Sequence, residues 1–327
     1  MPKNSGSRQS NSHMPSYVVA VDIGGTNLRV ALANRHGKML AKWSGSVGSD
    51  SSPKAVVQVI RGAVGYLLTE VGASLHSLSG VAAGAPGVTD RKAGVVFATS
   101  YLRGWKKVPL AALLQSALHI PAAVENDVKL AAIGESWLGA ARGVQNFVFL
   151  AIGTGIAAGV VVNGQLLNGP QCIAGEVGYL IVPGTPESPV GRASPGSLET
   201  VIGGEGIRQH WRQVCKNGRG DLTATEIFAL AKNGDRLAKN VLERSARILA
   251  YAIHNMSTVL NSSLFVLGGG VGTNNALLMA TRRILQPYSQ PSRPRLIRSA
   301  LGADAQLIGA IRLALDTAES RAISKGL

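Results

Sequence analysis

The stretch "VVAVDIGGTNLRVALANRHGKML", Val18–Leu40, places two glycines, a carboxylate, a threonine and an asparagine between two apolar runs. The runs Val18–Val21 and Leu28–Leu32 are typical of buried strands, and "NRHG" turns the chain into a third strand at 38–43. The stretch therefore predicts a meander of three strands. A dinucleotide site would instead need G-x-G-x-x-G leading into a helix, and a P-loop would need G-x-x-x-x-G-K-[ST]. Neither pattern occurs in this stretch.

The same pattern returns about 130 residues later, in "NFVFLAIGTGIAAGVVVNGQLL" at 146–167. It again predicts a strand, a Gly-rich turn with a threonine, a second strand, and an Asn-Gly hairpin turn into a third strand. Two copies of one supersecondary unit indicate two similarly built domains related by duplication, and the alternative is chance recurrence of a common meander. Between and after the copies, short strands alternate with helices, which we expect over 53–71, 110–118, 126–139, 235–259 and 304–318. The segment "TATE", Thr223–Glu226, predicts a capping box at a helix start, and another helix is expected after the glycines at 268–270.

Length and composition agree with a two-domain α/β protein. The chain has 327 residues, 46% of them hydrophobic, and 40 glycines, which suit many strand-to-helix corners. Its two cysteines, Cys172 and Cys215, are far apart in the sequence, which favours a reduced, cytoplasmic setting and argues against a Cys-rich zinc site.

Charge and the first residues bear on partners and location. Residues 1–16 are polar and basic without an apolar core, so we expect a disordered tail rather than a signal peptide or an anchor. No window has the ~18–20 apolar residues of a spanning helix, so no membrane partner is expected. The net charge of +15 is spread along the chain, which favours a solvated basic surface over a nucleic-acid site.

The two Gly-Thr turns suggest a phosphate site. Each offers backbone N–H groups and a threonine hydroxyl, and a third glycine cluster, Gly268–Gly270, ends a strand where a base or ribose could lie against bare backbone. Three such sites suit a nucleoside triphosphate held between two domains. Asp22, beside the first turn, is a candidate Mg²⁺ ligand, directly or through water, and its alternative role is an Asx cap of the turn.

Three further acids are candidates for binding hydroxyl groups of a substrate or for accepting the proton of its reacting hydroxyl. Asp127 follows a strand and opens a helix, a position that projects into a cleft and suits a base, although Asn126 and Asp127 are also favoured N-cap residues. Glu176 and Glu199 lie in Gly-rich segments where polyol hydroxyls could find acceptors, and the alternative is that both are solvated loop residues.

Taken together, these segments resemble the ROK family of repressors, open reading frames and sugar kinases, within the actin, Hsp70 and sugar-kinase superfamily. The resemblance rests on motifs in order from Val18 to about Ala318: "DIGGTNLRVAL", "GAPGVTD", "GWKKVPL", "VENDVKLAAIGE", "GTGIAAGVVVNGQLLNG", "AGEVGY", "GSLE", "VLGGGV" and "LGADAQLIGAIRLA". It implies an α/β fold of two ribonuclease H-like domains, each a mixed β-sheet flanked by helices, with the ligand cleft between them. The domains would comprise 17–123 plus 303–327, and 124–302.

The resemblance also implies a role for each candidate residue. Asp127 would be the general base, and the sugar would be bound by Gly87, Asn126, Glu176, Tyr179 and Glu199. ATP would be bound by Gly24, Gly25, Thr26, Asn27, Gly153, Thr154, Gly155, Gly269 and Gly270, with Mg²⁺ at Asp22.

One departure from the family concerns zinc. Many members have a histidine at the position of Tyr179, followed by C-x-C-G-x-x-G-C, and these residues bind a structural zinc. Here the segment is the cysteine-free "PGTPESPVGRASPGSLE", 183–199, so we predict no zinc site. Tyr179 cannot replace a zinc-bound imidazole, but its hydroxyl could bond a sugar oxygen.

The sequence thus predicts a cytoplasmic, homodimeric, ATP- and Mg²⁺-dependent hexose kinase that is glucokinase-like. The alternatives are an N-acylmannosamine or other hexose kinase, and a non-catalytic sugar-sensing protein. The family's repressors carry a helix-turn-helix before the first phosphate motif. The 17 residues before Val18 are too few for that module, and Asp127 and the "DIGGT" glycines are intact, so the enzyme is the favoured reading.

Overall fold

The computed structural model describes residues 17–98, 102, 104–187, 195–215, 220–288 and 294–324. The predicted tail, 1–16, lies outside the described residues, as does much of the predicted loop at 182–197. In the described part of the chain, none of the helices combines the length and the apolar character that a membrane span requires.

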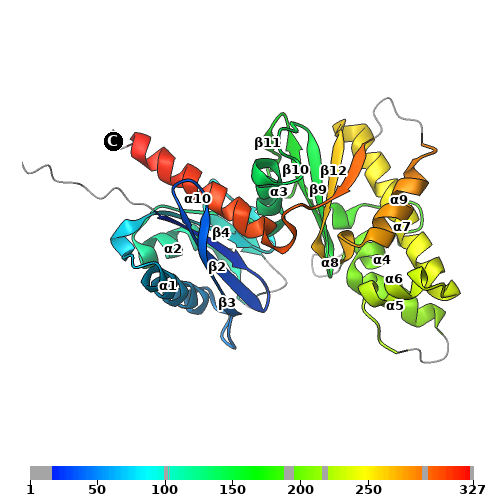
Figure 1. Cartoon of the computed structure of the whole chain (residues 1–327), viewed down its shortest axis with the longest axis horizontal. Helices are drawn as coiled ribbons and strands as arrows, with labels where there is room; N and C mark the ends of the chain where they lie inside the picture. Colours follow the sequence, from blue (N-terminus) through cyan, green and yellow to red (C-terminus); the bar gives the residue numbers. More distant parts are fainter. Residues whose placement is uncertain are drawn as a thin grey trace, which may run out of the picture.

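The first sheet begins with the quoted meander (Figure 1). Its strands follow the order β3-β2-β1-β4-β8, in which β1, β2 and β3 are antiparallel neighbours and β4 and β8 are added in parallel. The bounds are β1 (Tyr17–Ile23), β2 (Asn27–Asn34), β3 (Met39–Ser46), β4 (Leu78–Ala85) and β8 (Ala122–Asn126). The predicted three-strand meander is confirmed.

Helices cover both faces of this sheet because successive side chains of β1 point to opposite sides. Val19 and Val21 pack in one core with α1 (Pro53–Glu70) and α2 (Leu110–Leu118). Val18 and Ala20 pack in another with α10 (Ala305–Ser324). The last helix of the chain therefore completes the first half of the molecule.

The second sheet repeats this plan, with the order β11-β10-β9-β12-β13. Its bounds are β9 (Phe147–Ile152), β10 (Ile156–Val162), β11 (Gln165–Leu166), β12 (Leu264–Gly268) and β13 (Arg295–Arg298). Again three antiparallel strands are followed by two parallel ones. Val148 and Leu150 face the core that holds the long helix α7 (Arg236–Leu260), whereas Phe147 and Phe149 face α3 (Asp127–Leu138). The predicted repeat of one supersecondary unit, and with it the α/β fold class, is confirmed.

Helices α3 and α10 join the two halves, and the strands of the two sheets lie on opposite sides of α3 (Figure 1). Leu130 of α3 packs in the core of the first sheet, while its neighbours Ala131 and Ala132 pack in that of the second. The two helices touch backbone to backbone, because a Cβ on Gly309 would lie 1.8 Å from the carbonyl oxygen of Leu130. No side chain larger than hydrogen fits at this crossing.

Several elements were not predicted. A small sheet of β5 (Val88–Asp90), β6 (Val95–Ala98) and β7 (Lys106–Val108) follows β4, and β11 is only two residues long. Around the second sheet lie α4 (Glu199–Ile202), α5 (Gly204–Val214), α6 (Ala224–Lys232), α8 (Gly269–Gly272) and α9 (Asn275–Leu285), of which α6 and α9 were predicted. Of these, α6 has the capping box predicted by "TATE", with Thr223 and Glu226 bonded reciprocally.

Candidate active site between the two sheets

The candidate base, Asp127, stands where β8 ends and α3 begins. The cap of that helix is Asn126, whose Oδ1 accepts hydrogen bonds from the backbone N–H of Val128 (3.0 Å) and of Lys129 (3.1 Å). Asp127 is instead the first residue of the helix, and its Oδ1 accepts from the N–H of Val128 at 2.8 Å. Of the two candidate N-cap residues, Asn126 is therefore the one that caps the helix, and Asp127 is not needed to begin it.

The electrostatic setting of Asp127 suits proton transfer near neutral pH. Burial raises the pKa of its carboxyl group to about 7, and the negative charges of Asp22 and then of Glu176 add to the rise. Backbone hydrogen bonds from the start of α3 act in the opposite direction but are outweighed. A carboxylate with this pKa is a far better proton acceptor than an ordinary aspartate.

Asn126 also connects the site to Pro86 and Gly87, which lie between β4 and β5. Its Nδ2 donates to the carbonyl oxygen of Gly87 at 3.1 Å. Gly87 has a φ of 93°, a conformation that favours glycine. Two of the predicted sugar-binding residues are therefore in direct contact.

The two candidate sugar-binding glutamates lie on the second half of the molecule. Glu199, at the start of α4, accepts a hydrogen bond from the N–H of Ile156 at 3.0 Å, and its carboxylate covers Gly155 so closely that a Cβ there would lie 2.1 Å from Oε2. Burial raises the pKa of Glu176, and the charge of Glu199 adds to it while that of Lys129 opposes it. The structure thus brings Asp127, Glu176 and Glu199 into one electrostatic neighbourhood.

The two Gly-Thr turns have similar local structures. In the first, the N–H of Gly24 donates to the carbonyl oxygen of Asn27 at 2.8 Å. In the second, the N–H of Gly153 donates to that of Gly155 at 2.9 Å. Thr26, Asn27 and Thr154 are exposed at the tips of the turns, and Gly25 is partly exposed.

The third glycine cluster lies against the second turn. Gly269, with a φ of 77°, packs on the carbonyl of Ile152, where a Cβ would come within 2.3 Å of the oxygen. A Cβ at Gly153 or at Gly270 would meet no atom within 4 Å. These two glycines thus leave free space beside the turn, as a bound nucleotide would need.

Asp22 is held by an arginine. Arg29, opposite it on β2, donates to Oδ2 of Asp22 from Nε at 2.8 Å and from Nη2 at 2.5 Å. The same side chain reaches the carbonyl of Ala303, just before α10, at 2.5 Å. In the part of the chain described, no three His, Cys, Asp or Glu side chains are placed to share a metal ion. A lone, ion-paired carboxylate fits Mg²⁺ held through water and by phosphate oxygens rather than by a protein cage.

Tyr179 lies at the edge of the site. It closes the short 3₁₀ turn Val177–Tyr179, and its N–H donates to the carbonyl of Glu176 at 3.2 Å. Its side chain is 46% exposed. The backbone therefore ties Tyr179 to Glu176, while the ring is at the surface.

Sequence reasoning missed Lys129, which is only 3% exposed. Its Nζ donates to Oδ1 of Asn168 at 2.8 Å and to the carbonyl of Cys172 at 3.1 Å, and so it fixes the segment that leads to Glu176. A lysine within the otherwise apolar helical run "VKLAAI" was the available signal, because a buried lysine must find partners.

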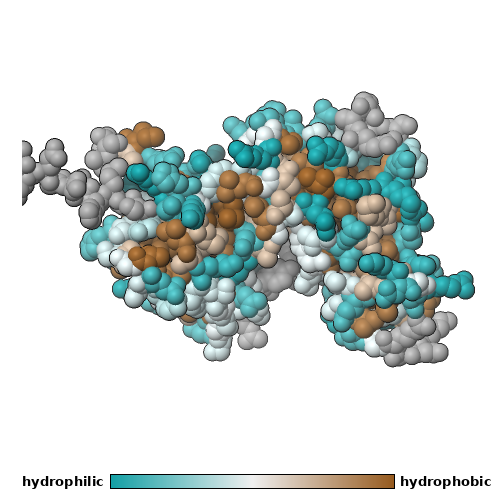
Figure 2. All heavy atoms as spheres, viewed as in Figure 1, coloured by the Kyte–Doolittle hydropathy of each residue, from teal (hydrophilic) through white to brown (hydrophobic). Residues whose placement is uncertain are grey.

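The molecular surface is hollowed between the two halves (Figure 2). Two copies of one sheet, with acids and Gly-Thr turns where the two halves meet, define a protein of the actin, Hsp70 and sugar-kinase fold. The chain belongs to the ROK family, whose family model matches residues 18–317. The family predicted from the motifs is thereby confirmed.

The relatives include two kinds of sugar kinase. A glucokinase of Halalkalibacterium halodurans is 31% identical over 90% of this chain and 93% of its own. An N-acetylmannosamine kinase of Escherichia coli is 28% identical over 89% and 96% of the two chains. Among solved structures, a ROK hexokinase from Thermus thermophilus superposes with a TM-score of 0.77 at 29% identity, covering 93% of this chain and 99% of that one.

Proposed function

We propose that this protein is an ATP-dependent hexose kinase whose preferred sugar is glucose. The observation that supports it most directly is Asp127, whose pKa is raised to about 7 at the junction of the two halves. Asn126 caps the helix in its place, so Asp127 is available to accept a proton. The 31% identity to a glucokinase over nearly the whole of both chains supports the same assignment.

The sugar would lie against the acids. Asp127 accepts the proton of the attacking hydroxyl, while Asn126, the carbonyl at Gly87, Glu176 and Glu199 bind the other hydroxyls. Tyr179 contributes its phenol at the rim, where it is free to contact a substituent on the ring. Carboxylates accept hydrogen bonds strongly, and a pair of them positions a polyol with little freedom to rotate.

ATP would lie across the two turns. The backbone of Gly24, Gly25, Thr26 and Asn27 and that of Gly153, Thr154 and Gly155 would face its phosphates. The adenosine would lie beside Gly269 and Gly270, where Gly270 leaves free space. Mg²⁺, held at Asp22 through water, would neutralise charge on the phosphates. Phosphoryl transfer depends mainly on such positioning and charge stabilisation, so this chain's own task is to align the hydroxyl and remove its proton.

We further propose how the chain is organised. The domains are divided at the junction of β8 and α3 rather than at the expected 123/124, because β8 pairs with β4 as far as Asn126. The first comprises 17–126 plus 303–327 and the second 127–302. The protein acts in the cytoplasm as a homodimer, without zinc, nucleic acid or membrane as a partner.

A second candidate is an N-acylmannosamine kinase. It is favoured by the 28% identity to such a kinase and by the exposed Tyr179, since a residue at the rim can select for a substituent on the sugar.

The test is ADP release with a panel of hexoses and amino sugars, each with and without Mg²⁺, and with Asp127→Asn as the inactive control. We expect glucose to give the highest kcat/KM and Mg²⁺ to be required. A higher kcat/KM for N-acetylmannosamine would favour the second candidate. Sugar binding without turnover would overturn the enzymatic proposal in favour of a sugar-sensing protein.

A further inference from the structure

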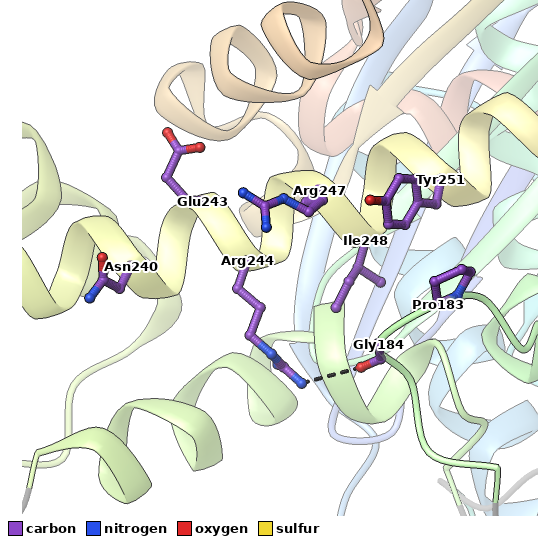
Figure 3. A pocket seen from close by; sticks show the side chains of 8 residues that line it. All are labelled: Pro183, Gly184, Asn240, Glu243, Arg244, Arg247, Ile248 and Tyr251. Atoms are coloured by element: carbon purple, nitrogen blue, oxygen red, sulfur yellow. Dashed lines mark hydrogen bonds between the residues drawn. The ribbon is translucent and has the colours of Figure 1, made fainter. Parts of the chain in front are cut away.

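A pocket lies away from the site just described, on the outer side of α7. It has a volume of about 550 Å³, is open to solvent, and is bordered by the segment at Pro183–Gly184 and by one face of the helix (Figure 3). The helix contributes Glu243, Arg244, Arg247, Ile248 and Tyr251 to its lining. None of these residues is used in the proposed kinase reaction.

The pocket carries an excess of positive charge. Its acid, Glu243, is bound by Arg283 of α9, whose Nη2 lies 2.6 and 2.5 Å from the two carboxylate oxygens. Within the described residues, neither Arg244 nor Arg247 forms an ion pair. Burial lowers the pKa of Arg244, and its charge in turn helps to lower the pKa of the neighbouring His210. The cost of holding a half-buried guanidinium would be offset by an anion.

The rest of the pocket lining is apolar and could contact the carbon skeleton of a ligand. Ile248 is buried and Tyr251 partly so, and the Tyr251 ring is held edge-on by Tyr288, with centroids 6.1 Å apart and planes at 85°. A rigid aromatic ring next to an aliphatic side chain gives an apolar contact surface beside the two guanidinium groups. Since guanidinium groups match phosphate oxygens in geometry and charge, we propose that this pocket binds a small phosphate monoester such as a sugar phosphate.

The pocket is connected to the sugar site through the backbone. Nη2 of Arg244 donates to the carbonyl oxygen of Gly184 at 3.3 Å (Figure 3), and the Thr185 hydroxyl bonds both the N–H and the carbonyl of Val182, which makes one compact turn. That turn follows Tyr179 by three residues. A phosphate that draws Arg244 away from Gly184 releases the turn, so the ligand alters the KM for the sugar. This coupling rests on the proposed kinase function, whereas binding itself does not.

Binding is tested by calorimetry on the Asp127→Asn protein with saturating glucose present, which occupies the sugar site and prevents turnover. Glucose 6-phosphate is titrated into that protein, into the same protein with Arg244→Ala and Arg247→Ala, and into a control with Arg61→Ala and Arg142→Ala. The control removes the same charge from exposed positions elsewhere. We expect at least a tenfold loss of affinity in the first pair and less than a twofold change in the control.

Other titrants identify the ligand class. Inorganic phosphate should bind more weakly than glucose 6-phosphate, because it lacks the part that contacts Tyr251 and Ile248. Equal affinity in the two arginine-substituted pairs, no binding of the ester, or tighter binding of citrate would each overturn the proposal. Glucose 6-phosphate that binds to a protein inactive with every sugar would contradict the kinase function but leave the pocket assignment intact.

Discussion

At the scale of single residues, Asn126 caps helix α3 and Asp127 is its first residue. This difference in role explains how the N-terminus of a helix can present a reactive acid. An aspartate that caps its helix has its oxygens occupied by backbone N–H groups, which lower its pKa. Here Asn126 accepts two of those bonds, and Asp127 is left with a pKa raised to about 7. An uncharged cap beside a half-buried acid is therefore the local arrangement that leaves Asp127 able to accept a proton.

This leads to a prediction for the pH dependence of catalysis. Because the base must be ionised, kcat/KM should rise with pH through about 7 and then level off. Asp127→Asn should lower kcat by about 10²–10⁴-fold, the usual contribution of a general base, with little change in sugar affinity and no rise near pH 7. Initial rates between pH 5.5 and 9 measure both effects, with Asp50→Asn at an exposed position as the control. A wild-type profile that is flat across pH 7 would refute the assignment.

The same carboxyl group predicts a pH-dependent cost in stability. Its pKa in the folded protein lies above the ordinary value of 3.8, so the folded state binds the proton more tightly than the unfolded chain. The contribution of this group to stability is therefore fully present below about pH 4 and is lost as pH rises from about 4 through 7. Asp127→Asn should raise the melting temperature at pH 8, because a pKa raised from 3.8 to about 7 corresponds to at most about 4 kcal/mol, at about 1.36 kcal/mol per pKa unit. In a chain of 327 residues each kcal/mol recovered raises the melting temperature by about 1–2 °C. Thermal melts at pH 4 and pH 8 should show the gain at pH 8 only.

At the scale of elements, the connection from β13 to α10 is held by one acid of α3. The Glu135 carboxylate is fully buried and accepts hydrogen bonds from the Ser299 hydroxyl and from the N–H groups of Ala300 (3.3 Å) and Leu301 (3.1 Å). It also accepts from the N–H of Ala140 at 2.6 Å, which fixes the end of its own helix. One side chain thus secures both helices that join the two halves.

Glu135→Gln should therefore destabilise the fold. The amide group turns an acceptor into a donor that faces N–H groups, and the expected loss is about 1–3 kcal/mol in the free energy of unfolding. Urea denaturation followed by circular dichroism measures it, with Glu319→Gln on the exposed side of α10 as the matched control. Equal midpoints for the two variants would show that the Glu135 hydrogen bonds contribute nothing.

The elements also show what sequence could and could not reveal. Both meanders, the helices at 53–70, 110–118, 127–138 and 236–260, and the capping box at Thr223 were predicted because each has a periodic apolar pattern or a distinct start signal. The small β5–β7 sheet was missed because its strands are three or four residues long, too short for a pattern. In α5 the first turn is "GEG", which obscures a helix whose apolar contacts are Ile207 and Trp211.

The sequence predicted which residues form the candidate site, but not the contacts between them. Asp22, Asp127, Glu176 and Glu199 are recognisable from their glycine-rich contexts and motif order. The Arg29–Asp22 ion pair and the contacts of Lys129 with Asn168 and Cys172 arise from the pairing of strands and the return of a loop. Such tertiary contacts leave no local pattern, and they decide how each acid is oriented.

At the scale of the whole molecule, the residues of the candidate site are shared between the halves. Asp22 and the first turn belong to the first sheet, whereas Glu199 and the second turn belong to the second half. In the described part of the chain, the backbone passes from one half to the other at the β8–α3 junction and again in the segment leading to α10, and Glu135 holds the second of these connections. A ligand that contacts acids of both halves must therefore change the angle between the two halves.

This arrangement predicts that sugar and nucleotide close the molecule. Glucose with a non-hydrolysable ATP analogue should reduce the radius of gyration measured by small-angle scattering, because contacts to both halves are formed together and water is expelled from between them. The Asp127→Asn protein is suitable, since it binds without turning over. The matched control adds Glu176→Gln and Glu199→Gln, which weaken the sugar contacts on the second half and should leave the protein extended. The prediction is contradicted if calorimetry shows the sugar bound to the Asp127→Asn protein while the radius of gyration is unchanged. Catalysis would then have to proceed without closure of the two halves, and the sugar alone would exclude water.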